Sequence, residues 1–170
     1  MTNLANQITR VPRIFNADQA DEARLALPGL ATEVAALVAG AGSVSPYLLD
    51  LMQKESAWCV QALSDPASAV QAVIDGAGDV ADEQLSPHLR QGKRRIALMT
   101  GLADLAGAWT LEQVTSTLSR FADAACHAAL RAGLRAQIKR GKLPGMTAED
   151  AETGAGMVVL AMGKMGANEL

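Results

Sequence analysis

Apolar residues along most of this chain recur every three or four positions, which is the spacing of one face of an α-helix. The longest such segment spans 111–140, with apolar positions Leu111, Val114, Leu118, Phe121, Ala122, Ala125, Ala129 and Leu130. At its start, Thr110 and Gln113 have the spacing of a capping box, in which the side chain of each residue accepts a hydrogen bond from the backbone amide of the other. The pattern predicts a long helix over 111–140.

Five shorter helices are predicted ahead of this segment, over 16–27, 30–39, 46–64, 66–75 and 87–105. Two of them have a strong start signal. Ser45-Pro46 and Asp65-Pro66 each place a side-chain oxygen before a proline at the first helical position, where the missing N–H costs nothing. These helices predict a mainly α fold, with a helical region over 16–140.

The two ends of the chain differ from this helical region. Residues 1–15 lack a clear period, and we expect a loosely held arm there. Residues 141–156 are rich in glycine and acidic side chains, which is typical of a linker. The apolar run 157–162 then resembles a buried strand and leads directly into a glycine turn at 163–166. We therefore predict that 157–170 is the start of a second, truncated domain.

Composition supports helices and narrows the possible partners. Hydrophobic residues make up 49% of the chain and aromatic residues only 3%, which favours close-packed helices. The formal net charge of −3 argues against nucleic acid as a partner. No apolar run approaches the roughly 20 residues that span a bilayer, and the first 16 residues lack the apolar core of a secretory signal. We expect a cytoplasmic protein that does not enter a membrane.

The two cysteines, Cys59 and Cys126, both fall inside predicted helices and are expected to be buried free thiols. His127 follows Cys126 directly. Neighbouring helix positions point about 100° apart, so this pair cannot share a metal ion or act as nucleophile and base. We expect His127 to be a partly exposed helix residue, and the sequence offers no metal ligands.

A basic cluster in the predicted helix 87–105 consists of Arg90, Lys93, Arg94 and Arg95. Such a cluster could meet nucleotide phosphates or an acidic partner surface. The simpler interpretation, which we prefer at this point, is a solvated helix face.

The glycine turn differs from the best-known phosphate-binding patterns. A P-loop needs four residues between its first glycine and a Gly-Lys-Ser/Thr end. Here six residues separate Gly156 from Gly163, and Met165 stands where the hydroxyl residue belongs. The dinucleotide fingerprint is also missing. A lone Gly-Lys-x-Gly is more often a tight turn between a strand and a helix than a phosphate site.

Three groups of residues carry a resemblance to a known family. The first is Ser45-Pro46-Tyr47-Leu48 followed by Glu55-x-x-Trp58. The second comprises the runs 89–98, 102–105, 111–115 and 118–123, and the third is 158–170. In this order they resemble the amino-terminal half of the bifunctional glutamine synthetase adenylyltransferase/adenylyl-removing enzymes. The resemblance covers 45–170, and residues 1–44 match only loosely.

This resemblance implies a DNA polymerase β-like nucleotidyltransferase domain, beginning with the strand at 157–162. Gly163, Lys164 and Gly166 would then lie near the phosphates of an adenine nucleotide. The family's Asp-x-Asp pair, which would hold Mg²⁺, is expected beyond Leu170. The resemblance therefore assigns neither catalytic residues nor metal ligands to this chain, and we expect the chain alone to be inactive.

The implied activity is removal of AMP from an adenylylated tyrosine of glutamine synthetase by phosphorolysis, with AMP addition from ATP in the enzyme's other half. By resemblance, the partners are glutamine synthetase and the PII nitrogen-signalling protein. An alternative is a non-catalytic helical interaction module that binds one of these two proteins. Because an unpaired apolar strand tends to pair with another copy, self-association through swapping of 157–162 is also expected.

Overall fold

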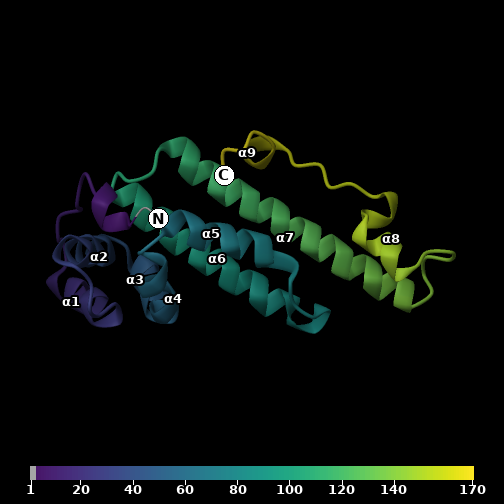
Figure 1. Ribbon diagram of the computed structural model, residues 1–170, viewed down its shortest axis with the longest axis horizontal. Coiled ribbons are helices and arrows are strands. Elements are labelled where there is room, and N and C mark those ends of the chain that lie inside the picture. The colour runs from purple at the N-terminus through teal and green to yellow at the C-terminus, as the bar shows by residue number, and fades with distance from the viewer. Residues whose placement is uncertain (1–2) are drawn as a thin grey trace.

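The computed structural model describes residues 3–170 and is mainly helical, as predicted (Figure 1). Two long helices, α6 and α7, lie side by side with α5, and the shorter helices α1 to α4 pack at one end. The described residues contain no strand. The helices are α1 (Ala17–Ala26), α2 (Thr32–Val44), α3 (Pro46–Lys54), α4 (Ser56–Ala62), α5 (Pro66–Asp75), α6 (Asp82–Leu105), α7 (Leu111–Lys139), α8 (Ala148–Glu152) and α9 (Gly163–Gly166), and short 3-10 turns occupy Leu4–Gln7, Gly76–Gly78 and Gly154–Gly156.

The start signals found in the sequence act as helix caps. The side chains of Asn16, Ser45 and Asp65 each accept a hydrogen bond from the backbone amide three residues later. Thr110 and Gln113 form the complete capping box at the start of α7. Each cap satisfies an amide that has no partner inside the helix, which fixes where the helix begins.

Three boundaries differ from the predicted ones. The helix expected over 46–64 is divided at Glu55 into α3 and α4. Helix α6 begins at Asp82 and contains Pro87, because Asp82 pairs with Arg135 of α7 and this contact holds the extra first turn. Helix α2 continues through Gly40 and Gly42 to Val44, beyond the predicted end at residue 39.

The glycines of α2 allow close packing of neighbouring segments. A Cβ at Gly42 would lie 2.6 Å from the Cβ of Ala23 in α1, which is closer than real side chains pack. A Cβ at Gly40 would collide with the backbone carbonyl of Pro12. Tertiary contact therefore keeps these residues helical, although glycine disfavours a helix interior.

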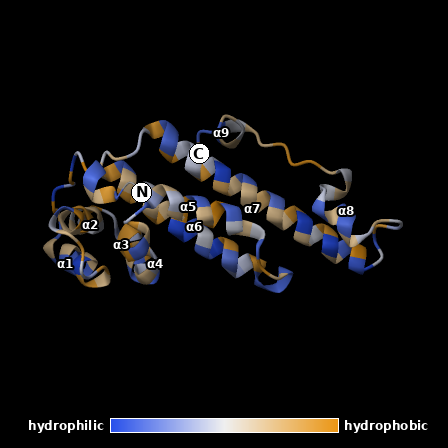
Figure 2. Cartoon of the chain, viewed as in Figure 1, coloured by the Kyte–Doolittle hydropathy of each residue, from blue (hydrophilic) through white to orange (hydrophobic). Residues whose placement is uncertain are grey.

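The core lies where α2 and α3 meet α6. All three helices contribute buried apolar side chains to it. Hydrophobic and hydrophilic residues are interspersed along the helices (Figure 2). The largest fully buried side chains include Leu37, Leu51, Met52, Ile96, Leu98, Met99 and Leu102. This core anchors the α6 segment that carries the basic cluster.

The amino-terminal segment lies against this core from residue 3 onward. Leu4 is fully buried, and its amide donates to the Leu63 carbonyl at 3.1 Å. The amides of Thr9 and Arg10 both donate to the Ala106 carbonyl. Residues 1–2 of the expected arm lie outside the described part of the chain.

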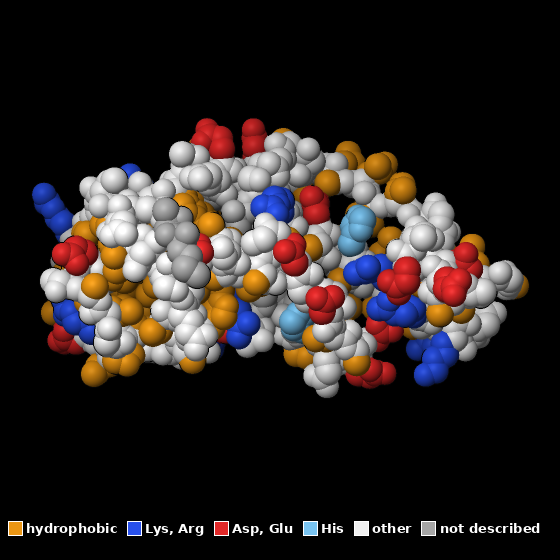
Figure 3. All heavy atoms as spheres, viewed as in Figure 1, with side chains coloured by type: hydrophobic (Ala, Val, Ile, Leu, Met, Phe, Trp, Pro, Cys, Tyr) orange, Lys and Arg blue, Asp and Glu red, His pale blue; other side chains and the backbone are white. Residues whose placement is uncertain are grey.

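The carboxy-terminal segment runs back along α7 (Figure 1). Residues 157–162 are extended but have no partner strand among residues 3–170, so the structure does not show the predicted strand. Backbone groups form a ladder only beside another strand. The segment exposes apolar side chains at Val158, Leu160 and Met162 (Figure 3). Its end is placed by the Leu170 amide, which donates to the Ser119 hydroxyl at 3.3 Å.

Helix α8 is fastened to α7 by ion pairs. Arg135 lies between Asp82 of α6 and Glu152 of α8. Its Nη2 is 2.6 Å from Asp82 Oδ1, and its Nη1 is 2.5 Å from Glu152 Oε1. The Arg135 hydrogen bond lowers the pKa of Asp82 below its usual value.

Within residues 3–170, no helix combines the length and the apolar character that a bilayer crossing requires.

Candidate functional site

The glycine turn predicted to face nucleotide phosphates forms α9, a single helical turn on the surface. Gly163, Lys164 and Gly166 are all exposed. Gly163 has a φ of 61°, and a Cβ at Gly166 would lie 2.5 Å from the Ala161 carbonyl oxygen. The backbone geometry of the turn therefore requires both glycines, whether or not a phosphate binds there.

The side chains around this turn do not fit a magnesium ion. Magnesium sites use carboxylates. Glu169 is the sole acidic residue between Met157 and Leu170. Across residues 3–170, the side chains of histidine, cysteine, aspartate and glutamate nowhere form a group of three able to hold a metal.

A buried carboxylate joins the α3–α4 junction to the basic cluster of α6. The Glu55 side chain is only 2% exposed. Its Oε1 accepts from Arg94 Nε at 2.7 Å, and its Oε2 accepts from Arg95 Nε at 3.0 Å. Gln91 Nε2 makes a longer contact of 3.5 Å with Oε2. The interruption of the helix at Glu55 thus places this carboxylate against α6.

This arrangement divides the basic cluster into two pairs. Arg90 and Lys93 are exposed, as a solvated helix face requires. That interpretation is wrong for Arg94 and Arg95, which are partly buried and share the Glu55 carboxylate. The sequence contained one signal for this, because Glu55 lies in an otherwise apolar stripe where an acidic side chain needs a partner.

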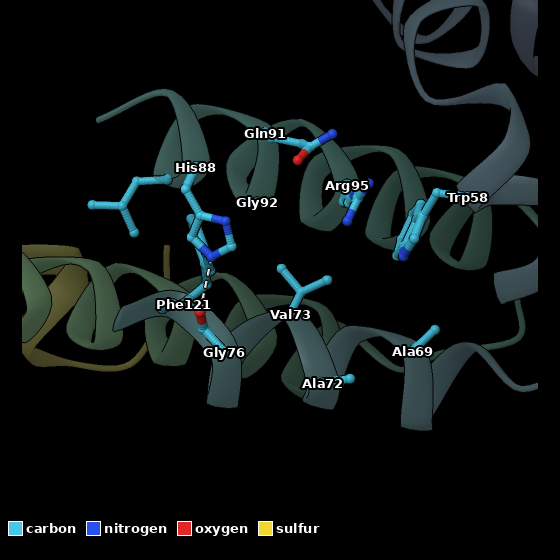
Figure 4. Close-up of a pocket in the computed structure, with 12 residues that line it drawn as sticks. Trp58, Ala69, Ala72, Val73, Gly76, His88, Gln91, Gly92, Arg95 and Phe121 are labelled. Atoms are coloured by element: carbon cyan, nitrogen blue, oxygen red, sulfur yellow. Dashed lines mark hydrogen bonds between the residues drawn. The ribbon is translucent and has the colours of Figure 1, made fainter. Parts of the chain in front are cut away.

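Beside these ion pairs, a cavity of about 220 Å³ lies between α4, α5, α6 and α7 (Figure 4). Trp58, Ala69, Val73 and Phe121 form apolar walls. Its polar lining comes from α6, through His88, Gln91 and Arg95. The cavity therefore combines apolar walls with one cationic side, which is the usual character of a small-molecule site.

The polar groups of the cavity are held in defined positions. The guanidinium carbon of Arg95 lies 5.4 Å from the centre of the Trp58 ring, a distance typical of a cation–π contact. His88 Nε2 lies 2.8 Å from the Gly76 carbonyl oxygen. A carbonyl only accepts, so Nε2 is the donor, and in the neutral ring Nδ1 is left as an acceptor.

The two cysteines differ in their surroundings. Cys59 is a buried free thiol, as predicted, and burial raises the pKa of Cys59 to about 12. Cys126 is also free but only partly buried, and the adjacent His127 is exposed. Neither residue belongs to a metal centre within residues 3–170.

Thiol labelling tests this difference. The thiolate is the reactive form, so Cys59 stays unreactive at mildly alkaline pH, far below its raised pKa. We expect iodoacetamide to modify one thiol per native chain, at Cys126, and a Cys126→Ser variant to remain unlabelled. Peptide mass spectrometry would locate the label. Rapid labelling of Cys59 in the native protein would contradict the burial seen here.

Fold and site together define a helical domain that carries a cationic cavity and ends in a surface glycine turn. Residues 28–170 match the family model of glutamate-ammonia ligase adenylyltransferase. The chain belongs to this family.

Several relatives described as bifunctional glutamine synthetase adenylyltransferase/adenylyl-removing enzymes are similar to the chain. The protein of Bradyrhizobium sp. (strain BTAi1 / ATCC BAA-1182) is 37% identical over 158 residues, covering 84% of this chain and 16% of the relative. That of Caulobacter vibrioides is 34% identical over 182 residues, covering 100% of this chain and 18% of the relative. The chain thus spans less than a fifth of either relative's length. No solved structure matches it.

Proposed function

We propose that this chain is the helical part of a cytoplasmic enzyme that removes AMP from a tyrosine of glutamine synthetase and, through another part of the protein, adds AMP to it. The match of residues 28–170 to the adenylyltransferase family carries this proposal. Glutamine synthetase and the PII protein are the proposed partners.

We further propose that 157–162 pairs as a strand in a nucleotidyltransferase domain when the rest of such a domain is present. Side-chain exposure alternates along the segment, at 79% for Val158, 49% for Val159 and 82% for Leu160. An extended chain has this period of two. Gly163, Lys164 and Gly166 would then lie near the phosphates of the adenine nucleotide.

Residues 1–170 alone are proposed to be catalytically inactive. Phosphoryl transfer with magnesium depends on carboxylates that hold the metal and neutralise charge on the phosphoryl oxygens. The residues around α9 do not supply such a set. Their nearest acidic neighbour in the sequence is Glu169, which is exposed.

A phosphorolysis assay tests the proposed activity and its limits. Adenylylated glutamine synthetase, phosphate and magnesium would be mixed with this chain, and ADP release would be measured. We expect ADP no higher than in a blank, while the full-length Caulobacter vibrioides relative serves as the positive control. Clear ADP release by residues 1–170 alone would show that they contain a complete catalytic site.

The alternative is a non-catalytic module that binds glutamine synthetase or PII through its helices. The continuous core from Leu4 to Phe121 favours it, because such a core stabilises a helical domain without added subunits. A pull-down with purified glutamine synthetase and purified PII tests the module. Retention of neither protein would count against the module.

A further inference from the structure

We propose that the cavity between α4, α5, α6 and α7 binds a small organic monocarboxylate with an apolar body, and that Arg95 holds the carboxylate. This inference goes beyond the proposed AMP chemistry and uses residues far from α9 in the sequence. It therefore stands or falls separately from the phosphorolysis assay.

The charge balance beside the cavity favours an anion. Two guanidinium groups, from Arg94 and Arg95, share the single carboxylate of Glu55, which leaves one positive charge without a negative partner. The Glu55 side chain is buried, so solvent screens these charges less than at an open surface. A ligand with one negative charge would complete the pairing.

Arg95 also has donors available for that ligand. Its Nε is used by Glu55 Oε2 at 3.0 Å. Its terminal Nη groups make no hydrogen bond to any of residues 3–170. A guanidinium has five N–H donors in a planar fork, and carboxylates match that fork well. The cation–π contact with Trp58 places the guanidinium beside the ring at the edge of the cavity.

The walls and the size of the cavity select the body of the ligand. Val73, Ala69 and the ring of Phe121 present apolar surface in the cavity. The Trp58 ring adds a further apolar wall beside the cation. A water molecule takes about 30 Å³ in the liquid, so 220 Å³ corresponds to about seven waters. That is room for a compound of the size of benzoate. A strongly hydrated dianion such as inorganic phosphate gains nothing from apolar walls.

Binding can be followed at Trp58, because the chain has only two tryptophans. In a Trp109→Phe background, the indole N–H signal of Trp58 in a ¹H–¹⁵N spectrum reports on the cavity alone. Benzoate, benzamide and inorganic phosphate would be titrated separately. We expect a saturable shift with benzoate and an affinity at least about tenfold weaker with benzamide, which lacks the charge.

Two variants and one control locate the site. Arg95→Gln should weaken benzoate binding by about tenfold or more, since it removes a charge-assisted hydrogen bond. Ala69→Leu should do the same by filling the cavity while leaving every charge in place, so a loss there does not depend on the ion pairs. Arg90→Gln is the matched control, because it removes the same charge from an exposed position of α6 and should leave affinity unchanged.

Several results would overturn the proposal. These are the absence of a saturable shift with benzoate, equal affinity for benzamide, tighter binding of phosphate than of benzoate, or an Arg90→Gln loss equal to that of Arg95→Gln. Unchanged benzoate binding in a folded Ala69→Leu protein would likewise place the ligand outside the cavity.

Discussion

Replacing both Arg94 and Arg95 with glutamine should lower the free energy of unfolding by about 3–5 kcal/mol, the usual cost of leaving a buried charge without its partners. Glu55 is the charge concerned, since its side chain is 2% exposed and both arginines contact it at hydrogen-bond distance. The double variant leaves only the long contact from Gln91. Urea unfolding followed by circular dichroism would measure the difference.

The chain offers a matched control for this variant on the same helix. Arg90→Gln with Lys93→Gln also removes two positive charges, but from exposed positions. We expect this control to change stability by no more than about 0.5 kcal/mol, as exposed substitutions usually do. An equal loss in the two double variants would mean that net charge, rather than the Glu55 pairs, determines the effect.

A triple variant separates desolvation from packing. Adding Glu55→Gln to Arg94→Gln and Arg95→Gln removes the buried charge together with its partners. Replacing all members of a buried ion pair is often nearly neutral, whereas removing one side is costly. We therefore expect the triple variant to be more stable than the double variant. A further loss of stability on adding Glu55→Gln would contradict the assignment of Glu55 as a buried anion.

The helices could be predicted because their signals are local. A cap such as Ser45 or Thr110 acts on an amide three residues away, and an apolar stripe repeats within a few turns. The structure differs from the prediction where a segment distant in the sequence determines a helix boundary. Pro87 stays inside α6 although proline disfavours a helix interior, and the helix start ahead of it is held by Arg135, more than fifty residues away.

The candidate site was less predictable for the same physical reason. The glycine turn was found in the sequence, but its surroundings depend on which residues lie beside it in space. The cavity takes Trp58, Val73, His88 and Phe121 from four different helices, and no spacing rule connects them. Glu55 lies in a segment that resembles the family, yet its role follows only from the side chains of α6 that face it.

Two glycines that look alike in the sequence should respond in opposite directions to the same substitution. Gly92→Ala is expected to destabilise the protein by about 1–3 kcal/mol, the usual cost of adding a group to a packed interior. A Cβ at Gly92 in α6 would lie 2.8 and 2.9 Å from ring carbons of Phe121 and 3.4 Å from Val73. Phe121 is only 7% exposed and lines the cavity, so its ring can yield only by moving into that space and giving up part of its packing.

Gly133→Ala is the matched control within α7. Nothing lies within 4 Å of the Cβ that this change would add. Alanine favours a helix interior over glycine by about 0.5–1 kcal/mol, so the control should stabilise the protein by that amount. Thermal and urea unfolding of both single variants would show whether each substitution raises or lowers the stability.

The sign of the stability change in Gly92→Ala also bears on the cavity. Gly92 and Phe121 both line the cavity and set how closely α6 approaches α7. Helix propensity alone favours alanine at both positions. A stabilising Gly92→Ala would therefore mean that α6 and α7 are further apart than described. Destabilisation at Gly92 with stabilisation at Gly133 would show that the close helix contact is real, and that the walls of the cavity are held in place by packing rather than by helix propensity.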